Sequence, residues 1–357
     1  LLILFGAFLA IMSWTTGSTG RCDDCSTFIG LNFLWEPDFT TLANPKIWLA
    51  AAGQIFFTLS VGMGTIHCYS SYLKQKDDIA LNAMAAGWMN GFVEIVLGSA
   101  VVIPIAVGYL GLDWVIENAG FMMAFKTMPF LFDQWGSVIA VISGVAWFGL
   151  LFFAGITSSL AMGTPFMGFV QDEFNWSKNK SAIILGVSIL AMGLPTILFF
   201  EKGVFDEYDY WTGTVSLVVF ALAEVILFAW VFGMDKGWAE INDGADMKVP
   251  KIYRPIIKYV TPLFIGTILF TSLIKPLNGE LSDWSTAWNS LLSGNGWPWA
   301  TDSIINKVFH LDTGVIWWEN DVLTDMFYID MSRYFLLTCF FVLVAMVKAA
   351  SNKRKKR

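Results

Sequence analysis

Two groups of polar residues lie inside apolar stretches of the chain, where their oxygen atoms could bind a cation. Asn90 and Glu94 are four residues apart, so they share one face of a helix. Ala154, Thr157 and Ser158 are spaced i, i+3 and i+4, and one carbonyl with two hydroxyls suits a hard cation. Each group also has a purely structural interpretation. Asn can bond a neighbouring backbone, and Ser and Thr hydroxyls often bond carbonyls of their own helix.

The segment that must position much of this chemistry is residues 50–72, AAAGQIFFTLSVGMGTIHCYSSY. It is long enough to cross a bilayer, yet residues 58–64 are poor helix formers, because each interior glycine costs about 1 kcal/mol. Unpaired backbone groups in hydrocarbon are costlier still. The pattern indicates either a glycine-kinked packing helix or a helix broken at the membrane centre, where the freed backbone meets an ion, a substrate or water.

The composition indicates a polytopic membrane protein. Of the 357 residues, 56% are hydrophobic and 14% charged, and the mean hydropathy is +0.60, whereas soluble domains average about 25% charged residues. A hydrocarbon core of about 30 Å needs roughly 20 apolar residues. Seven stretches meet this need, near 47–72, 79–110, 137–170, 181–200, 211–233, 254–274 and 332–349.

Other classes of function find little support in the residues. The net charge of −7 gives no basis for binding nucleic acid. The apolar stretches contain no Ser–His pair, His-Glu-x-x-His motif or paired aspartates, so an enzyme is not expected. Cys22 and Cys25 are expected to form a local disulfide or to stay as thiols rather than bind zinc. Glu94 and Glu224 are the acids within the apolar stretches, and the partner of Glu224 is not evident.

Five motifs together resemble the neurotransmitter:sodium symporter family. GQIFFTLSVGMG resembles its sixth helix, MNGFVEIVLG its seventh and FFAGITSSLAMGTP its eighth, while FDEYDYWTG resembles the start of the tenth and VQDEF the inner end of the eighth. The resemblance implies an all-α polytopic membrane protein, the C-terminal part of a twelve-helix inverted-repeat (5+5) transporter fold. Because the chain opens within an apolar run, we expect it to begin in the fifth helix, with about seven full transmembrane helices plus a half helix.

The resemblance implies sodium-coupled symport of an amino acid or a related small zwitterion by alternating access, with sodium as coupling ion and no other cofactor. Thr58 and Asn90 match one sodium site; Ala154, Thr157 and Ser158 match the second. The matching substrate pocket consists of Phe57, Thr58, Ser60, Gly62, Met63, Ser158 and Met162. The alternative left open is a non-transporting membrane protein that acts as a binding or scaffold module.

Chloride independence is expected from Glu94. Chloride-dependent relatives hold an anion near the sodium ion partly by a Ser at this position, and chloride-independent bacterial relatives have an acid there. Gln54, one turn before Thr58, is expected in the same polar cluster. By the same resemblance Asp209 matches the outer-gate acid and Asp172 the inner-gate acid, with Tyr72 near it.

The connections suggest an orientation. With the tail KRKKR inside, fifteen of the 22 basic residues fall on inside connections and seven outside, as the positive-inside rule requires. We therefore expect a multi-pass protein of the cell membrane with a cytoplasmic C-terminus. Residues 1–357 are interpreted as one partial transporter domain, 109–136 as a lid-like outer loop of short helices, and 276–331 as an outer insert of unknown role. A homodimer is left open.

Overall fold

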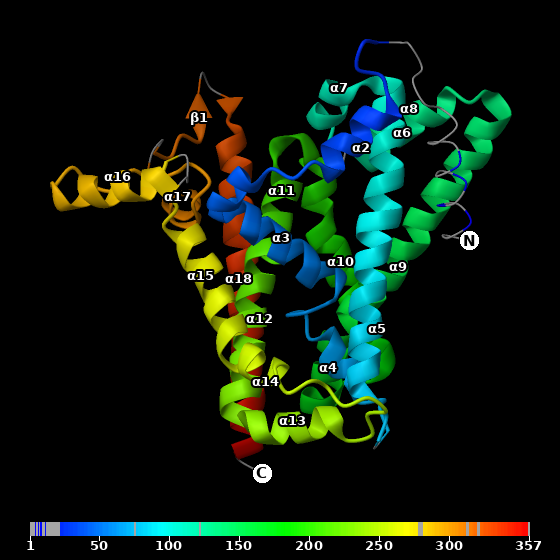
Figure 1. Ribbon diagram of the computed structural model, residues 1–357. Helices are drawn as coiled ribbons and strands as arrows, with labels where there is room; N and C mark the ends of the chain where they lie inside the picture. Colours follow the sequence, from blue (N-terminus) through cyan, green and yellow to red (C-terminus); the bar gives the residue numbers. More distant parts are fainter. Residues whose placement is uncertain are drawn as a thin grey trace. The chain divides into compact units, whose positions relative to one another are not determined.

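The apolar segments of the sequence form helices, and the described chain is mostly helical (Figure 1). The computed structural model describes residues 22–355 apart from 75, 121–122, 278–280, 312–313 and 320–321; before residue 22 it describes residues 4, 6, 8 and 11. The chain divides into two compact units. Unit 1 comprises Leu1–Asp38 and Asn82–Leu160, and unit 2 comprises Phe39–Leu81 and Ala161–Arg357.

Six helices among the described residues are long and apolar enough to cross a membrane: Ile79–Val96, Ser137–Phe174, Lys178–Leu198, Val204–Asn242, Tyr253–Leu273 and Asp325–Lys355. The seventh predicted stretch forms α3 (Pro45–Thr58) and α4 (Thr65–Ser70), which are separately too short to span. Each of the seven predicted segments is therefore helical, and one of them is interrupted.

Several spanning helices contain π-helical turns, which are often found at functional sites. α5 (Ile79–Gly91) continues through the turn Phe92–Ser99 into α6 (Ala100–Leu110). The turns Asp209–Val215 and Leu227–Gly233 join α11 (Val204–Tyr208), α12 (Ser216–Ile226) and α13 (Met234–Asn242). The turn Ile256–Val260 joins α14 (Tyr253–Pro255) to α15 (Thr261–Leu273). The remaining long helices are α9 (Ser137–Phe174), α10 (Lys178–Leu198) and α18 (Asp325–Lys355).

In unit 1, α2 (Thr27–Trp35) packs along α6. A Cβ at Gly30 would lie 2.7 Å from the Pro104 Cα, so glycine permits the close approach of these helices. Cys22 and Cys25 form a disulfide just before α2, one of the two outcomes expected. Between α6 and α9 lie α7 (Leu112–Glu117), the π-helical turn Met123–Thr127 and α8 (Met128–Asp133), so short helices form within 109–136 as predicted.

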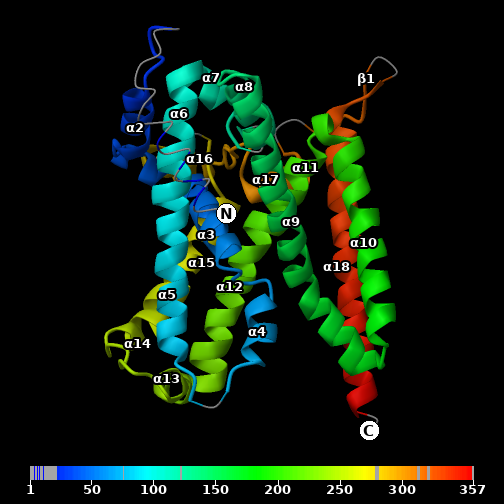
Figure 2. The ribbon, with the colours of Figure 1, turned by 90° about the vertical axis from the view of Figure 1, so that its right-hand side faces the viewer.

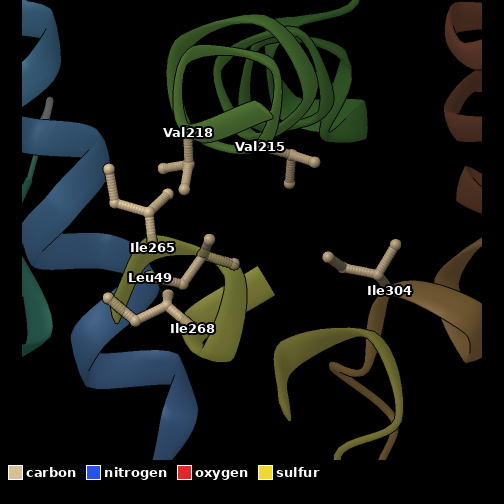
Figure 3. Close-up of a cluster of buried hydrophobic side chains, with 6 residues drawn as sticks. All are labelled: Leu49, Val215, Val218, Ile265, Ile268 and Ile304. Carbon is tan, nitrogen blue, oxygen red and sulfur yellow. The ribbon is translucent and has the colours of Figure 1, made fainter. Parts of the chain in front are cut away.

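In unit 2, α3 packs against α12 and α15 around a buried apolar cluster (Figure 3). Asn44 caps α3, its Oδ1 accepting from the Lys46 N–H at 3.0 Å, and Pro45 occupies the first turn, where its missing N–H is harmless. A Cβ at Gly53 would lie 2.9 Å from the Thr214 Cγ2. The cluster contains Leu49, Val215, Val218, Ile265, Ile268 and Ile304.

The insert 276–331 contains α16 (Leu281–Leu292), α17 (Ile304–Phe309) and a hairpin of β1 (Trp318–Glu319) and β2 (Val322–Leu323). The strands are antiparallel, with Trp318 opposite Leu323. Short 3₁₀ helices at Phe39–Ala43 and Phe200–Lys202 complete the described elements.

A largely buried ion pair joins α18 to α11. Arg333 donates from Nε and Nη2 to the two carboxylate oxygens of Glu207, at 2.8 and 3.1 Å. The Arg333 side chain also donates to the Lys307 carbonyl and, at 3.3 Å, to Asp330 Oδ1. The guanidinium of Arg333 on α18 thus bonds to groups on both α11 and α17. The Arg333 and Glu207 side chains are 13% and 8% exposed, so little water can reach these hydrogen bonds.

We predict that Arg333→Met lowers the stability of the protein by about 3–5 kcal/mol, because the substitution removes the guanidinium that pairs with the buried Glu207 carboxylate. The carboxylate keeps the Trp211 Nε1–H donor at 2.8 Å and the Lys307 ammonium group at 3.8 Å. Thermal unfolding in detergent measures the effect. The control is Arg254→Met, which removes an exposed pair with Asp235 and should cost about 0–1 kcal/mol. Equal melting temperatures for the two variants would contradict a structural role for the buried pair.

Candidate functional site

An irregular segment separates α3 from α4 (Figure 2). It begins as a Schellman motif. The Val61 N–H donates to the Phe56 carbonyl at 2.8 Å, and the Ser60 N–H donates to the Phe57 carbonyl at 3.1 Å. Ser60 has φ 57°, the left-handed conformation that this motif requires and that glycine usually supplies. Gly62 and Gly64 follow with φ 78° and 75°. The chain therefore leaves the helix completely, so the broken-helix interpretation is the correct one for this segment.

Glu224 on α12 compensates part of the backbone freed by the break. The Gly62 N–H donates to Glu224 Oε2 at 3.2 Å, and His67 Nδ1 on α4 lies 3.7 Å from the other carboxylate oxygen. A Cβ at Gly62 would lie 2.9 Å from the Leu217 carbonyl oxygen, so only glycine permits both the backbone angle and the contact with α12. The acid without an evident partner in the sequence thus has two neighbours at the break.

The predicted substrate residues of unit 2 gather at this break. Phe57 is the last residue but one of α3, with a side chain 45% exposed. Thr58 ends α3, and its Oγ1 donates to the Ile55 carbonyl at 3.2 Å. Ser60, Gly62 and Met63 form the irregular segment itself. Gln54 lies one turn earlier and is exposed. The segment therefore presents backbone groups, hydroxyls and one aromatic ring within a few residues.

In unit 1, Asn90 and Glu94 contact each other as their spacing predicts. The Asn90 Nδ2 donates to Glu94 Oε2 at 3.2 Å, and both side chains are partly buried. Glu94 lies in the π-helical turn Phe92–Ser99. The hydrogen bond therefore holds the side-chain amide of Asn90 beside the carboxyl group of Glu94.

The second predicted cation set lies on α9. The Thr157 hydroxyl donates to the Phe153 carbonyl at 2.9 Å and to the Ala154 carbonyl at 3.1 Å. This brings together two of the three predicted oxygens, and the lone pairs of the hydroxyl remain available to a cation. Ser158 follows on the same helix and Met162 one turn later; both are exposed.

The predicted gate residues lie at helix ends of unit 2. Asp209 is exposed and opens the π-helical turn Asp209–Val215. Asp172 is exposed near the end of α9, and Tyr72, 76% exposed, has its ring 6.5 Å from that of Tyr69. The neighbour of Asp172 was not predicted from the sequence. Glu173 is buried, and it accepts from Arg354 Nε at 3.0 Å while its carbonyl accepts from Lys353 Nζ at 2.9 Å.

Spanning helices, a discontinuous helix and intramembrane carboxylates define a polytopic membrane protein of the secondary-carrier class. The model of one family, the sodium:neurotransmitter symporter family, matches residues 26–311, more than half of the chain. The chain belongs to this family. It is a family of symporters, not of enzymes, and its members are multi-pass membrane proteins.

Relatives and a solved structure agree with this assignment. The chain is 28% identical over 267 residues to an uncharacterized sodium-dependent transporter of Methanocaldococcus jannaschii, covering 72% of this chain and 53% of the relative. It is 25% identical over 272 residues to sodium-dependent nutrient amino acid transporter 1 of Drosophila grimshawi, covering 71% and 42%. The crystal structure of MhsT in complex with L-phenylalanine matches with a TM-score of 0.65 at 28% identity, covering 75% of this chain and 59% of that one.

The predicted all-α polytopic membrane fold of this transporter family is thereby confirmed. The structural match to MhsT identifies the helices of this chain as part of a transporter fold. The chain spans about half the length of the curated relatives it matches.

We predict that Glu224→Leu loosens the break, because it removes an acceptor from the Gly62 N–H. A hydrogen bond to a charged group contributes about 1.5–3 kcal/mol. The expected result is amide exchange at residues 60–64 faster by about 10- to 100-fold in hydrogen-exchange mass spectrometry. Glu224→Gln keeps a carbonyl oxygen and should change exchange less. Unchanged exchange in the Leu variant would show that Glu224 does not hold the break.

Proposed function

We propose that the full-length protein is a sodium-coupled symporter that carries an amino acid or a related small zwitterion across the cytoplasmic membrane. The observation that carries this proposal is the broken helix, whose irregular residues 59–64 offer polar backbone at membrane depth. Irregular backbone in a membrane is tolerated where it lines a cavity or is buried in protein. Family membership supports sodium coupling, and the Drosophila relatives and MhsT support an amino acid as substrate.

In this proposal two sodium ions use neutral oxygen ligands. Thr58 and Asn90 contribute to one site, and Ala154, Thr157 and Ser158 contribute to the other. Carbonyl, amide and hydroxyl oxygens suit a hard monovalent cation that must also be released. The hydrogen bond from Asn90 to Glu94 supports the first site, since it fixes the amide beside a carboxylate. The contact of Thr157 with the Ala154 carbonyl supports the second.

The substrate is proposed to bind along the break. Phe57, Thr58, Ser60, Gly62 and Met63 line one side of the pocket, and Ser158 and Met162 contribute from α9. Backbone groups of the break bind the charged ends of the zwitterion, and the apolar residues accept its side chain. Met63 is flexible and adapts to differently shaped side chains. We propose alternating access, with Asp209 in the outer gate and Asp172 with Tyr72 in the inner gate.

We further propose that the C-terminus is cytoplasmic. The basic end of α18 contacts Glu173 at the end of α9, and both were predicted to lie inside. Lys46 and Lys275 are two of the seven basic residues assigned to outside connections, and they meet at the same carboxylate, Asp302. This grouping supports the alternation of inside and outside connections. Residues 109–136 are proposed to cover the outer vestibule, within a single transporter domain that includes residues 1–357.

We predict that Asn90→Ala and Thr157→Ala each abolish sodium-stimulated binding of the substrate, because each removes an oxygen ligand from a cation site. Scintillation proximity binding with a labelled amino acid, with and without sodium, measures the loss. Thr338→Ala is the matched control, since the Thr338 hydroxyl also bonds its own helix, at the Tyr334 carbonyl, on α18. If both site variants keep the sodium dependence of the parent protein, the assignment of the sites is wrong.

We predict that uptake by the parent protein is independent of chloride and that Glu94→Ser makes it chloride-stimulated. The carboxylate supplies negative charge beside sodium, and a serine hydroxyl can instead help to hold an anion. Uptake into proteoliposomes with chloride replaced by gluconate measures this. Glu117→Ser, on α7, controls for loss of an acid elsewhere in unit 1. An active Glu94→Ser variant that ignores chloride would contradict the role given to Glu94.

A further inference from the structure

Unit 2 contains a cavity of about 120 Å³ that belongs neither to the break nor to the predicted gates. It lies among the start of α3, the end of α15, the π-helical turn Asp209–Val215 and the insert. Tyr210 lines it, and Tyr210 is 14 residues before Glu224; at 1.5 Å per residue the two are about 20 Å apart along the helix. The lining residues are Lys46, Leu49, Tyr210, Ser272, Lys275, Asp302 and Lys307.

The lining carries more positive than negative charge, with three ammonium groups and one carboxylate. Asp302 accepts from Lys275 Nζ at 2.7 and 2.8 Å, and Lys46 Nζ lies 3.5 Å away. Burial alone would raise the pKa of Asp302, but these ammonium groups outweigh it and hold the pKa below its ordinary value. Asp302 is therefore ionised at neutral pH and offsets one of the three positive charges.

Lys307 is the ammonium group with the weakest compensation. Its Nζ lies 3.8 Å from Glu207 Oε1, beyond hydrogen-bond distance, and both oxygens of that carboxylate already accept from Arg333. The Lys307 Nζ also lies 4.2 Å from the centre of the Tyr210 ring. Burial lowers the pKa of Lys307 from its ordinary value, which means that its environment disfavours the charge. An anion in the cavity would favour it.

One of the lining residues, Tyr210, carries a hydroxyl that is buried and has no partner in the described part of the chain. The Ser272 hydroxyl has a long contact of 3.5 Å, to the Pro45 carbonyl, and can turn toward another acceptor. Buried hydroxyls normally have a hydrogen-bond partner. The hydroxyls of Tyr210 and Ser272 can both donate hydrogen bonds, and the lining has an excess of ammonium groups. Both features favour a ligand with acceptor atoms and a negative charge.

We propose that this cavity binds a small monoanion, either a halide or the carboxylate of a small organic acid. A water molecule occupies about 30 Å³ of liquid, so the cavity holds an anion of a few heavy atoms. The lining has two positive charges in excess. One of them, Lys46, has a side chain 64% exposed and is screened by water, which favours a single negative charge on the ligand. The anion would join the insert to α3 and α15.

Thermal unfolding of the full-length protein tests the proposal, at constant sodium concentration and ionic strength. Chloride, bromide or acetate is titrated against gluconate, which is too large for the cavity. A ligand that binds the folded state raises the melting temperature in a saturable way. We expect this rise for at least one of the three anions. Comparing the melting temperatures in halide and in acetate shows whether the cavity binds a halide or a carboxylate.

The variants Tyr210→Phe and Lys307→Met place the anion in the cavity. Loss of a hydrogen bond to a charged group should raise the half-saturating anion concentration by about tenfold in Tyr210→Phe. Tyr259→Phe and Lys178→Met lie outside the cavity and should behave as the parent protein does. For a halide, the anomalous signal of bromide should lie beside the Tyr210 hydroxyl. No saturable rise with any anion, or an equal rise in all variants, would overturn the proposal. Transport is not measured here, so the result is independent of the proposed function.

Discussion

The structure depends on one constraint, the pairing of backbone groups where an apolar helix stops inside the membrane. The Schellman motif after Thr58 satisfies the last carbonyls of α3 with the chain's own amides. Glu224 then accepts from the Gly62 N–H, which the motif cannot reach. This second pairing requires α12 close to the break, and the close approaches at Gly53 and Gly62 permit it. The packing of α3, α12 and α15 therefore both buries the apolar cluster and brings Glu224 within reach of the break.

Local rules were sufficient to place the elements of this site. The weak helix formers at 58–64 indicated a kink or a break, and the spacing of Asn90 and Glu94 placed them on one helix face, because both features depend on residues only a few positions apart. The seven apolar stretches were predicted for the same reason. Spacing could not reveal that Glu224 contacts Gly62, 162 residues earlier in the chain, since such pairs are set by packing of whole helices. The position of Glu224 within an apolar stretch did indicate that this acid needs a partner.

The insert 276–331 shows the same limit more strongly. No role could be assigned to its residues from their types and spacing. In the structure, Asp302 and Lys307 of the insert meet Lys46 and Lys275, residues predicted only as surface charges of separate loops. Single charges on loops are usually solvated. Here several charged side chains from separate segments line one cavity, and this grouping indicates a binding site. A cluster of this kind can be found only after the helices that carry the loops have been placed.

The position of the cavity relates it to the proposed outer gate by a physical argument. Tyr210 follows Asp209 directly in the π-helical turn, and Lys307, Arg333 and Glu207 form one electrostatic group around the same turn. A negative charge bound near Lys307 would strengthen the charged state of that group and stiffen the turn. Asp209 is then presented from a rigid support, although the anion lies about 20 Å along the helix from Glu224. The insert can thus support the turn that carries Asp209 without contributing a residue to the proposed substrate pocket.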